Sequence, residues 1–347
     1  MIEQTSEPGN QVMHHSSIGA APGDATIAVD GLTTHFFTKA GVVKAVDGIS
    51  FHVSPGEILG LVGESGSGKS ITGFSIMGLI DQPGRIVSGS IVFQNRNLAA
   101  LDNEEIRKIR GNRIAMIFQD PMMTLNPVLR VDTQMIEAVR AHQDVDRKTA
   151  LAMARDALDQ VGIPAPERRL KAYPHELSGG MRQRVAIATA FINKPDLIIA
   201  DEPTTALDVT IQAQILYEAQ ELCRKTGTAM IWITHDLAVV AALADRIAVM
   251  YAGRIVETGT TDNVIDHPLH PYTEGLIGSV PGHNKRGQRL AQIPGMTPSL
   301  INLPAGCAFR DRCGYADSAC GTAPPMSSPM PDRFTRCVHP LVSRGAI

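Results

Sequence analysis

The segment Gly63–Ser70, GESGSGKS, limits the possible folds of this chain more than any other feature. It matches G-x-x-x-x-G-K-[ST] in full, and it stands between a short apolar run, Ile58–Val62, and a stretch of helical character, Ile71–Ile80. Glycines allow backbone N–H groups to turn inward around phosphate oxygens, and the dipole of the following helix favours the same anion. The segment predicts a phosphate loop, in which Lys69 would approach the β- and γ-phosphates of a nucleotide and Ser70 would ligate Mg²⁺.

A second apolar run ends in two acids. Residues Leu197–Ala200 are followed directly by Asp201 and Glu202. Ligands of open α/β sheets bind at the carboxyl ends of the strands, so these acids should face the phosphate loop. We expect Asp201 to lie opposite Ser70 and to hold Mg²⁺ through water, and Glu202 to polarise an attacking water. Without a phosphate loop, a solvated strand end would be the simpler interpretation.

Composition and charge exclude several classes of protein. The 347 residues carry 32 basic and 35 acidic side chains, a net charge of −3, whereas proteins that bind nucleic acid without sequence preference carry a basic excess. The N-terminus has no pattern of a secretion signal. The longest apolar stretch, Leu237–Gly253, is interrupted by Asp245 and Arg246, so it falls short of the roughly 18 apolar residues of a membrane span. We expect a cytosolic protein that can dock on a membrane protein and has no nucleic-acid partner.

Periodicity divides the chain into regions. Short strand-like runs alternate with turns before residue 60, helical periodicity dominates residues 131–193, and strand-like and helical segments then alternate up to residue 251. This alternation predicts an α/β fold with a mostly parallel sheet and an all-helical insertion. We divide the chain into a disordered tail (1–23), a nucleotide-binding domain (24–260, with a helical subdomain at about 120–190) and a loop-rich C-terminal extension (261–347).

Four further motifs give the chain a family resemblance. Leu177–Arg184, LSGGMRQR, resembles the signature motif of ATP-binding-cassette (ABC) ATPases, and Gln119 in IFQDP resembles their Q-loop. Ala206–Asp208 resembles the D-loop, and His235 in ITHD resembles the switch histidine. The motifs stand in the family order, and the resemblance covers roughly residues 25–340. It implies the P-loop fold of ABC ATPases, with an antiparallel β-subdomain and an inserted helical subdomain, and it implies hydrolysis of ATP with Mg²⁺.

The resemblance also implies a head-to-tail dimer. A signature on the helical insertion cannot reach its own phosphate loop, so each signature closes over the ATP of the other subunit. Glu202 and His235 then act on the water and the γ-phosphate, and Gln119 senses the γ-phosphate and holds Mg²⁺ together with Ser70 and Asp201. The residues assigned to ATP are Gly63, Ser65, Gly66, Ser67, Gly68, Lys69 and Ser70 of one subunit, and Ser178, Gly179, Gly180 and Asp208 of the other.

An aromatic side chain upstream of the phosphate loop stacks on adenine in this family. Phe36 is the best positional match, and Phe37 is the alternative. Phenylalanine can replace the more usual tyrosine because stacking tolerates either ring. The competing interpretation is that both rings only pack within the sheet, as most aromatic side chains do.

Several segments resemble one branch, the ATPases of oligopeptide and dipeptide importers. They are Gln119–Pro127, Glu202–Gln212 and His270–Thr273, together with Pro294–Pro298 and Pro304–Cys313. The resemblance implies a peripheral subunit on the cytoplasmic face of the plasma membrane. Its partners would be a second ABC ATPase, identical or homologous, two transmembrane permeases and an external substrate-binding protein. Peptides are the expected cargo, and nickel or another small solute is the alternative.

Four cysteines lie near the C-terminus, and a fifth, Cys223, stands alone. The four are Cys307, Cys313, Cys320 and Cys337. In a cytosolic chain such a group favours a metal site over disulfides, although the tight C-x₂-C pairs of zinc ribbons are missing. Thiolates suit zinc or an iron–sulfur cluster, and the branch resemblance implies a [4Fe–4S] cluster. We expect its role to be structural, because ATP-driven import needs no redox chemistry, and His339, which closely follows Cys337, is a candidate neighbour of the centre. Zinc and four metal-free thiols are the alternatives.

Other classes of ABC ATPase fit the sequence less well. DNA-repair and chromosome-organising members need a long coiled coil before the signature, whereas residues 119–178 are too few and contain Gly162, Pro164 and Pro166. Translation factors usually carry two sets of motifs and exporters usually fuse membrane helices to the cassette, and we find neither feature in this sequence. Glu202 and His235 are both intact, which disfavours a non-catalytic binding module. The sequence therefore predicts the ATP-hydrolysing subunit of an importer.

Overall fold

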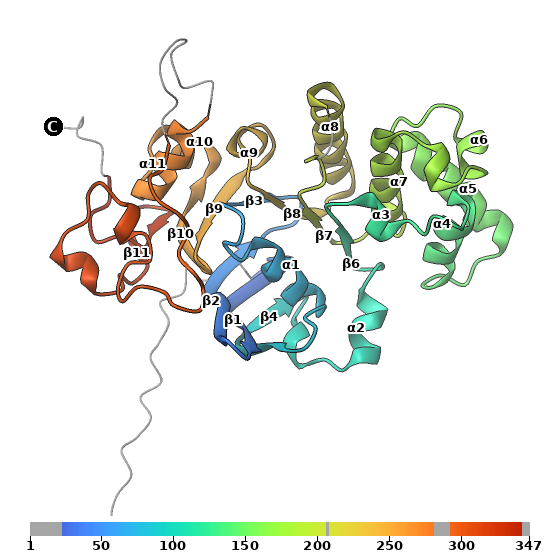
Figure 1. Cartoon of the computed structure of the whole chain (residues 1–347). Helices are drawn as coiled ribbons and strands as arrows, with labels where there is room; N and C mark the ends of the chain where they lie inside the picture. The colour runs from blue at the N-terminus through green and yellow to red at the C-terminus, as the bar shows by residue number, and fades with distance from the viewer. Residues whose placement is uncertain (1–22, 206–207, 281–291, 342–347) are drawn as a thin grey trace, which may run out of the picture.

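The computed structural model of the chain describes residues 23–205, 208–280 and 292–341. Within these ranges the centre of the molecule is a mixed eight-stranded sheet with the order β11-β12-β10-β9-β3-β8-β7-β6 (Figure 1). Strands β9, β3, β8, β7 and β6 pair in parallel, as the alternation of strands and helices predicts. The strands of this main sheet are β3 (Ile58–Val62), β6 (Ile114–Ile117), β7 (Leu197–Asp201), β8 (Ala229–Thr234), β9 (Arg246–Tyr251), β10 (Arg254–Thr260), β11 (Ser327–Met330) and β12 (Arg333–Thr335).

A smaller antiparallel sheet has the order β2-β1-β4-β5. The separate short strands expected before residue 60 are joined here into two long ones. The glycines that interrupt the apolar pattern, Gly31 and Gly48, have positive φ values of 57° and 68° and lie where the pairing register of β1 and β2 shifts, so β-bulges carry the strands past them. The strands are β1 (Ile27–Thr38), β2 (Gly41–Val53), β4 (Gly84–Phe93) and β5 (Arg96–Asn97).

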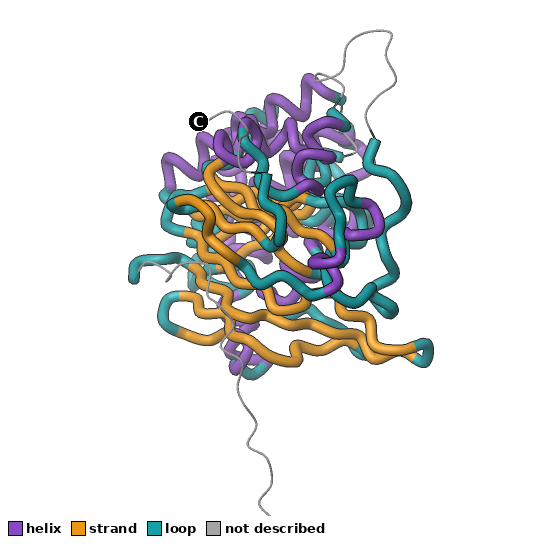
Figure 2. Tube along the Cα trace, turned by 90° about the vertical axis from the view of Figure 1, so that its left-hand side faces the viewer, coloured by secondary structure: helices purple, strands orange, loops and turns teal. Residues whose placement is uncertain are grey.

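Helices cover the main sheet on both faces. Helix α1 lies between the two sheets, and α8, α9 and α10 lie on the opposite face (Figure 1); Figure 2 shows most of the helices gathered above the strands. Alternate side chains of the parallel strands point to opposite faces of the sheet and pack into two separate hydrophobic cores. In β3, Ile58 and Val62 belong to one core, and Leu59 and Leu61 belong to the other. The helices are α1 (Lys69–Met77), α2 (Asn103–Ile109), α8 (Val209–Thr226), α9 (Leu237–Leu243), α10 (Thr261–Asp266) and α11 (Pro271–Gly278), with a 3₁₀ turn, η1, at Leu98–Ala100.

A group of helices lies at the end of the molecule beyond β6 and β7 (Figure 1). Helix α5 buries Ala150, Ala154, Ala157 and Leu158, an i, i+4, i+7, i+8 pattern that turns one face to the core. The two shortest helices, α3 and α6, were not predicted because a single turn carries no periodicity. The elements are α3 (Pro121–Thr124), α4 (Val131–Arg140), α5 (Arg147–Gln160), α6 (Pro166–Leu170), the 3₁₀ turn η2 (Pro174–Glu176) and α7 (Gly179–Phe191).

The residues after 260 contain more regular structure than the expected loops. Besides α10 and α11 they form two 3₁₀ turns, η4 (Arg310–Arg312) and η5 (Ser318–Gly321), and the hairpin β11–β12. Strand β12 pairs with β10 at Glu257↔Thr335, so the end of the chain extends the main sheet. In the described ranges no helix combines the length and apolar character that crossing a bilayer requires. The predicted tail, residues 1–23, lies outside the described residues except for Gly23.

Candidate nucleotide-binding and hydrolysis site

The phosphate loop joins the buried strand β3 to helix α1. Its glycines Gly63, Gly66 and Gly68 have φ values of 155°, 77° and 106°, which other residues rarely adopt. A Cβ on Gly68 would also overlap the carbonyl oxygen of Ala45. The glycines therefore give the loop a shape that no substituted sequence could take without strain.

Two side chains at the start of α1 point into this loop. The ammonium group of Lys69, which is 5% exposed, donates to the carbonyl oxygens of Gly63 (2.8 Å) and Glu64 (3.0 Å). Burial lowers the pKa of Lys69, and the nearby charges of Glu202 and Asp201 act in the opposite direction. The Ser70 hydroxyl donates to Asp201 Oδ1 at 2.9 Å. The structure thus brings Ser70 and Asp201 together across the sheet, and burial raises the pKa of Asp201.

Glu202 meets side chains from the ends of the two strands that flank its own. Its Oε2 accepts from Gln119 Nε2 (3.3 Å) and from the Thr205 hydroxyl (3.1 Å), and it lies 3.2 Å from His235 Nδ1. Gln119 follows β6, Glu202 follows β7 and His235 follows β8, so adjacent strands deliver the three groups to one point. Thr205 was not predicted, because nothing in the sequence marks it apart from its closeness to Glu202.

An open cavity of about 1260 Å³ lies in front of these groups. Phe36 lines it, whereas Phe37 is 40% exposed and carries the guanidinium of Arg85 at 4.3 Å from its ring. Of the two candidate rings, Phe36 is the one that lines the cavity, whereas Phe37 packs against Arg85. The other predicted residues that line the cavity are Ser65, Gly66, Gly68, Lys69, Ser70, Gln119, Glu202 and His235.

The signature residues lie apart from this cavity. Ser178 is exposed and caps α7, where its hydroxyl accepts from Met181 N at 3.3 Å. Asp208 is also exposed and caps α8 by accepting from Ile211 N at 3.0 Å. Neither these two residues nor Gly179 and Gly180 line the cavity that contains Lys69. A single chain does not bring the two halves of the predicted ATP site together; Ala206 and Leu207 lie outside the described residues.

Three residues from beyond position 260 contact Glu64 of the phosphate loop, and sequence reasoning did not predict these contacts. They are Tyr272, Thr297 and Arg312, which are 208, 233 and 248 positions away from Glu64. All three lie in segments that the sequence analysis assigned to the peptide-importer branch, but no local pattern could have identified their contacts with Glu64 over such separations.

The four C-terminal cysteines converge on a second, small cavity. They line it together with His270, Phe309 and His339. Burial raises the pKa of the Cys307 and Cys313 thiols and raises that of Cys337 to about 11. Cys223 is buried elsewhere, in α8, and burial raises its pKa to about 12, so its thiol is unreactive.

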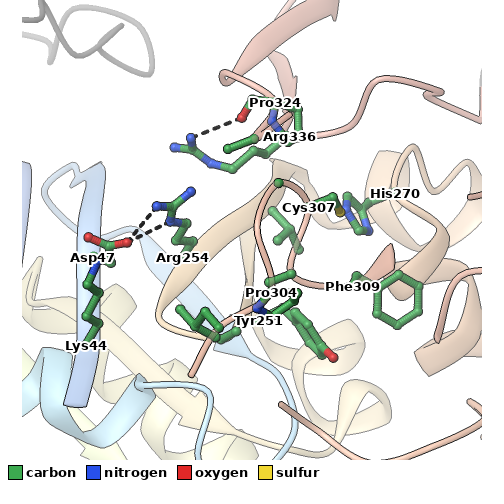
Figure 3. Close-up of a pocket in the computed structure, with 16 residues that line it drawn as sticks. Lys44, Asp47, Tyr251, Arg254, His270, Pro304, Cys307, Phe309, Pro324 and Arg336 are labelled. Atoms are coloured by element: carbon green, nitrogen blue, oxygen red, sulfur yellow. Dashed lines mark hydrogen bonds and ion pairs between the residues drawn. The ribbon is translucent and has the colours of Figure 1, made fainter. Parts of the chain in front are cut away.

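A neighbouring cavity of about 210 Å³ marks the boundary between the sheet strands and the C-terminal residues. Figure 3 shows Cys307 and His270 close together on one side of it and the ion pair of Asp47 and Arg254 on the other. In that pair Arg254 Nε and Nη2 both donate to Asp47 Oδ2, at 2.9 and 2.7 Å. The cysteine cavity therefore lies against the main body of the molecule.

Two family profiles match the chain. The profile described as "ABC transporter" matches residues 46–205, and the one described as "Oligopeptide/dipeptide transporter, C-terminal region" matches residues 256–320. The dipeptide transport ATP-binding protein DppD of Escherichia coli K12 is 47% identical over 322 residues, which cover 92% of this chain and 98% of DppD. The oligopeptide transport ATP-binding protein OppD of the same organism is 47% identical over 318 residues, 92% of this chain and 94% of OppD.

Solved structures of ATP-binding cassettes are also similar to this chain. The ATP-binding cassette MJ0796, solved as a dimer in a post-hydrolysis state with ADP and Pi, superposes with a TM-score of 0.62 at 26% identity, over 68% of this chain and 98% of that one. The cassette cbiO1 of Clostridium perfringens gives a TM-score of 0.60 at 26% identity, over 70% and 92% of the two chains. With its phosphate loop, its acid-bearing strand ends and the C-terminal region of the oligopeptide/dipeptide transporters, this chain belongs to the family of ABC transporter ATPases.

Proposed function

We propose that this chain hydrolyses ATP in a dimer of cassettes and thereby drives the import of di- or oligopeptides. One observation supports the hydrolysis of ATP most strongly. Polar side-chain atoms of Gln119, Thr205 and His235 lie within 3.3 Å of Glu202 Oε2, and Glu202 lines the same cavity as Lys69. The names of DppD and OppD, and the matched C-terminal region, support peptides as the cargo. Nickel or another small solute is the alternative cargo, and nothing in the described residues favours it.

Each residue of the site has a task that follows from its position. Backbone N–H groups within Gly63–Ser70, other than that of Glu64, and the Lys69 ammonium group bind the phosphates. Ser70, Asp201 and Gln119 would hold Mg²⁺, which neutralises the charge of the β- and γ-phosphates. Oxygen donors of this kind, two of them already hydrogen-bonded at 2.9 Å, suit that ion.

The carboxylate of Glu202 polarises the attacking water, and its neighbours fix its orientation. Gln119 and Thr205 donate to the same oxygen, Oε2. The other oxygen, Oε1, is left to accept from the water. His235, which is half exposed at 53%, can turn towards the γ-phosphate. Phe36, which also lines the cavity, stacks on adenine.

A second cassette would complete the site. Ser178, Gly179 and Gly180 present the N-terminal turn of α7 on the surface, and a turn of this kind favours a phosphate. In a head-to-tail dimer these residues and Asp208 would close over the ATP held by Lys69 of the partner subunit. The proposed division of the chain is a tail (1–23), a cassette (24–260, helical subdomain about 120–190) and an extension (261–347).

The extended proposal places the dimer on the cytoplasmic face of the plasma membrane. Two transmembrane permeases would bind it there, and an external binding protein would deliver the peptide. The names of the peptide-transporting relatives support this assembly.

We further propose that Cys307, Cys313, Cys320 and Cys337 hold a structural metal centre. Four thiols that line one cavity are the donor set of a [4Fe–4S] cluster, and they equally suit zinc. Oxygen and nitrogen donors lie beside them, since His339 Nε2 is 2.9 Å from Asp317 Oδ2. When bound, the centre would cross-link the residues of the extension.

The import function is tested in vesicles with the complete transporter. Radiolabelled dipeptide and ⁶³Ni²⁺ are offered separately, with ATP present on the cytoplasmic side. We expect uptake of the dipeptide, its loss in Lys69→Ala, and no uptake of nickel. ATP-dependent uptake of nickel alone would contradict the peptide assignment and leave the ATPase assignment intact.

The metal centre is tested on the full chain purified without oxygen. A cluster predicts a brown protein with absorbance near 400 nm, four iron and four sulfide per chain, and loss of the colour in Cys320→Ser. A colourless protein with one zinc per chain would replace the cluster by zinc, and a protein with neither metal would refute the centre.

A further inference from the structure

Arg312 of the extension makes an almost complete set of hydrogen bonds with the phosphate loop and its surroundings. Its Nη1 and Nη2 donate to Glu64 Oε2 at 2.6 Å and Oε1 at 2.9 Å. Its Nε donates to the carbonyl oxygen of Pro294 at 2.8 Å, and Nη1 also reaches the Tyr251 hydroxyl at 3.3 Å. The side chain is 6% exposed. A bidentate, buried guanidinium of this kind fixes the carboxylate it holds in both distance and orientation.

Glu64 is the second residue of the phosphate loop and is held at every polar group. Its N–H donates to the Tyr272 hydroxyl at 2.8 Å, and its carboxylate also accepts from the Thr297 hydroxyl at 3.0 Å. Its carbonyl oxygen accepts from the Lys69 ammonium group at 3.0 Å. The position of Glu64 therefore sets the position of the Lys69 cation as well as the course of the loop.

Glu64 and Arg312 are both ionised at neutral pH. Hydrogen bonds from Arg312, opposed by burial and supported by Thr297, lower the pKa of Glu64. The same carboxylate raises the pKa of Arg312. Both groups stay ionised, so the contact is a permanent feature of the folded protein.

The loop needs such an anchor because it contains three glycines. Gly63, Gly66 and Gly68 provide the shape that phosphate requires, but glycine also gives the free chain the largest choice of other shapes. Ordering the loop only when ATP arrives would weaken the affinity for ATP, and a loop ordered in advance avoids that loss.

We propose that Arg312 is a positioning residue of the ATP site, which holds the phosphate loop in its binding shape through Glu64 and makes the extension a working part of the nucleotide site. The proposal rests on the ATP-binding role proposed for Gly63–Ser70. Arg312 lies on η4, between Cys307 and Cys313, so the turn that carries it belongs to the same segment as the cysteine cavity.

The test measures ATP affinity and melting temperature of the full chain side by side. Arg312→Met keeps the length of the side chain and removes the charge, and Arg312→Lys restores the charge without the fork. Arg310→Met is the matched control, since Arg310 lies on the same turn but pairs with the exposed Asp311 at 3.2 Å. We expect the Kd and KM for ATP to rise about tenfold in Arg312→Met and less in Arg312→Lys, with kcat kept within about twofold; Arg310→Met should match the wild type.

Two further variants separate positioning from folding. Glu64→Gln should raise the Kd for ATP as Arg312→Met does, and the double variant should be no worse than either single one, because both remove the same contact. A purely structural role would lower the melting temperature and the active fraction without changing Kd or KM, and that result would overturn the proposal. Lys69→Ala separates failure of the Arg312 proposal from failure of the proposed ATP site. If Lys69→Ala also binds ATP with the wild-type Kd, the phosphate-loop assignment itself is wrong.

Discussion

The nucleotide cavity and the C-terminal extension are built in different ways. In the cavity, short turns after β3, β6, β7 and β8 deliver Lys69, Gln119, Glu202 and His235. The extension is instead connected to the rest of the molecule by ion pairs of buried arginines: Arg312 binds Glu64, and Arg333 binds Glu257. The comparison teaches that a side chain of the cavity can be changed with a loss of chemistry alone, whereas Arg333, which is buried and does not line the cavity, supports the fold.

The largest effect is expected in the cavity. Glu202→Gln removes the group that we propose polarises the attacking water, so the rate of ATP hydrolysis should fall by about a hundred- to ten-thousandfold. The amide keeps the shape of the carboxylate, and ATP binding and melting temperature should stay unchanged. A variant that hydrolyses ATP at the wild-type rate would refute the role of Glu202. A large fall in melting temperature would refute the contrast between the two regions.

The next effect belongs to the extension. Arg333 Nη2 donates to Glu257 Oε1 at 3.0 Å, and the two side chains are 4% and 0% exposed. Arg333→Met would leave the carboxylate buried without its cation, which should cost about 3 kcal/mol of unfolding free energy and roughly 5 °C in melting temperature.

The control for this variant is Arg107→Met. Its ion pair with Glu104 is 78% and 73% exposed, so little change is expected. Equal melting temperatures for Arg333→Met and the control would show that the extension is not fastened by its buried arginines.

The two regions also differ in how far the sequence could predict them. The loop, Asp201 and Glu202 stand in or beside contiguous motifs, and the strand–turn–helix context fixes where their side chains go. Arg312 and Tyr272 reach Glu64 from more than 200 positions away, and such contacts depend on tertiary packing. The clustering of the four cysteines in the sequence predicted that they lie together, as they do around one cavity, and the metal site itself stays a prediction. Strand β12 and its pairing with β10 were not predicted, because three residues carry no periodicity.

A medium effect is expected for Lys69→Ala. The phosphates would no longer receive hydrogen bonds from the ammonium group. ATP should therefore bind about 2 kcal/mol more weakly, which corresponds to a roughly thirtyfold higher Kd. Fluorescence titration with a labelled ATP analogue measures this, and the melting temperature without ATP should stay close to that of the wild type. An unchanged Kd for ATP would refute the assignment of Gly63–Ser70 as the phosphate loop.

The smallest effect is a pH dependence at the point where the two regions meet. The folded pKa of Glu64 lies below its unfolded value because Arg312 binds the carboxylate, so the stabilisation is present above the unfolded pKa of about 4.3 and is lost as the pH falls through the folded pKa. The wild type should be more stable than Glu64→Gln at pH 7, and the difference should shrink in acid below pH 4.3. A difference that does not change with pH would show that the pairing of charges contributes nothing.

The central claim is that two cassettes enclose ATP between the phosphate loop of one and the signature of the other. A structure of the complete transporter with Glu202→Gln, ATP and Mg²⁺ tests it most directly. The account predicts that the Ser178 hydroxyl and the Gly180 N–H lie about 3 Å, hydrogen-bond distance, from the γ-phosphate of the ATP held by Lys69 of the partner subunit. ATP bound at Lys69 with every signature facing solvent would contradict it.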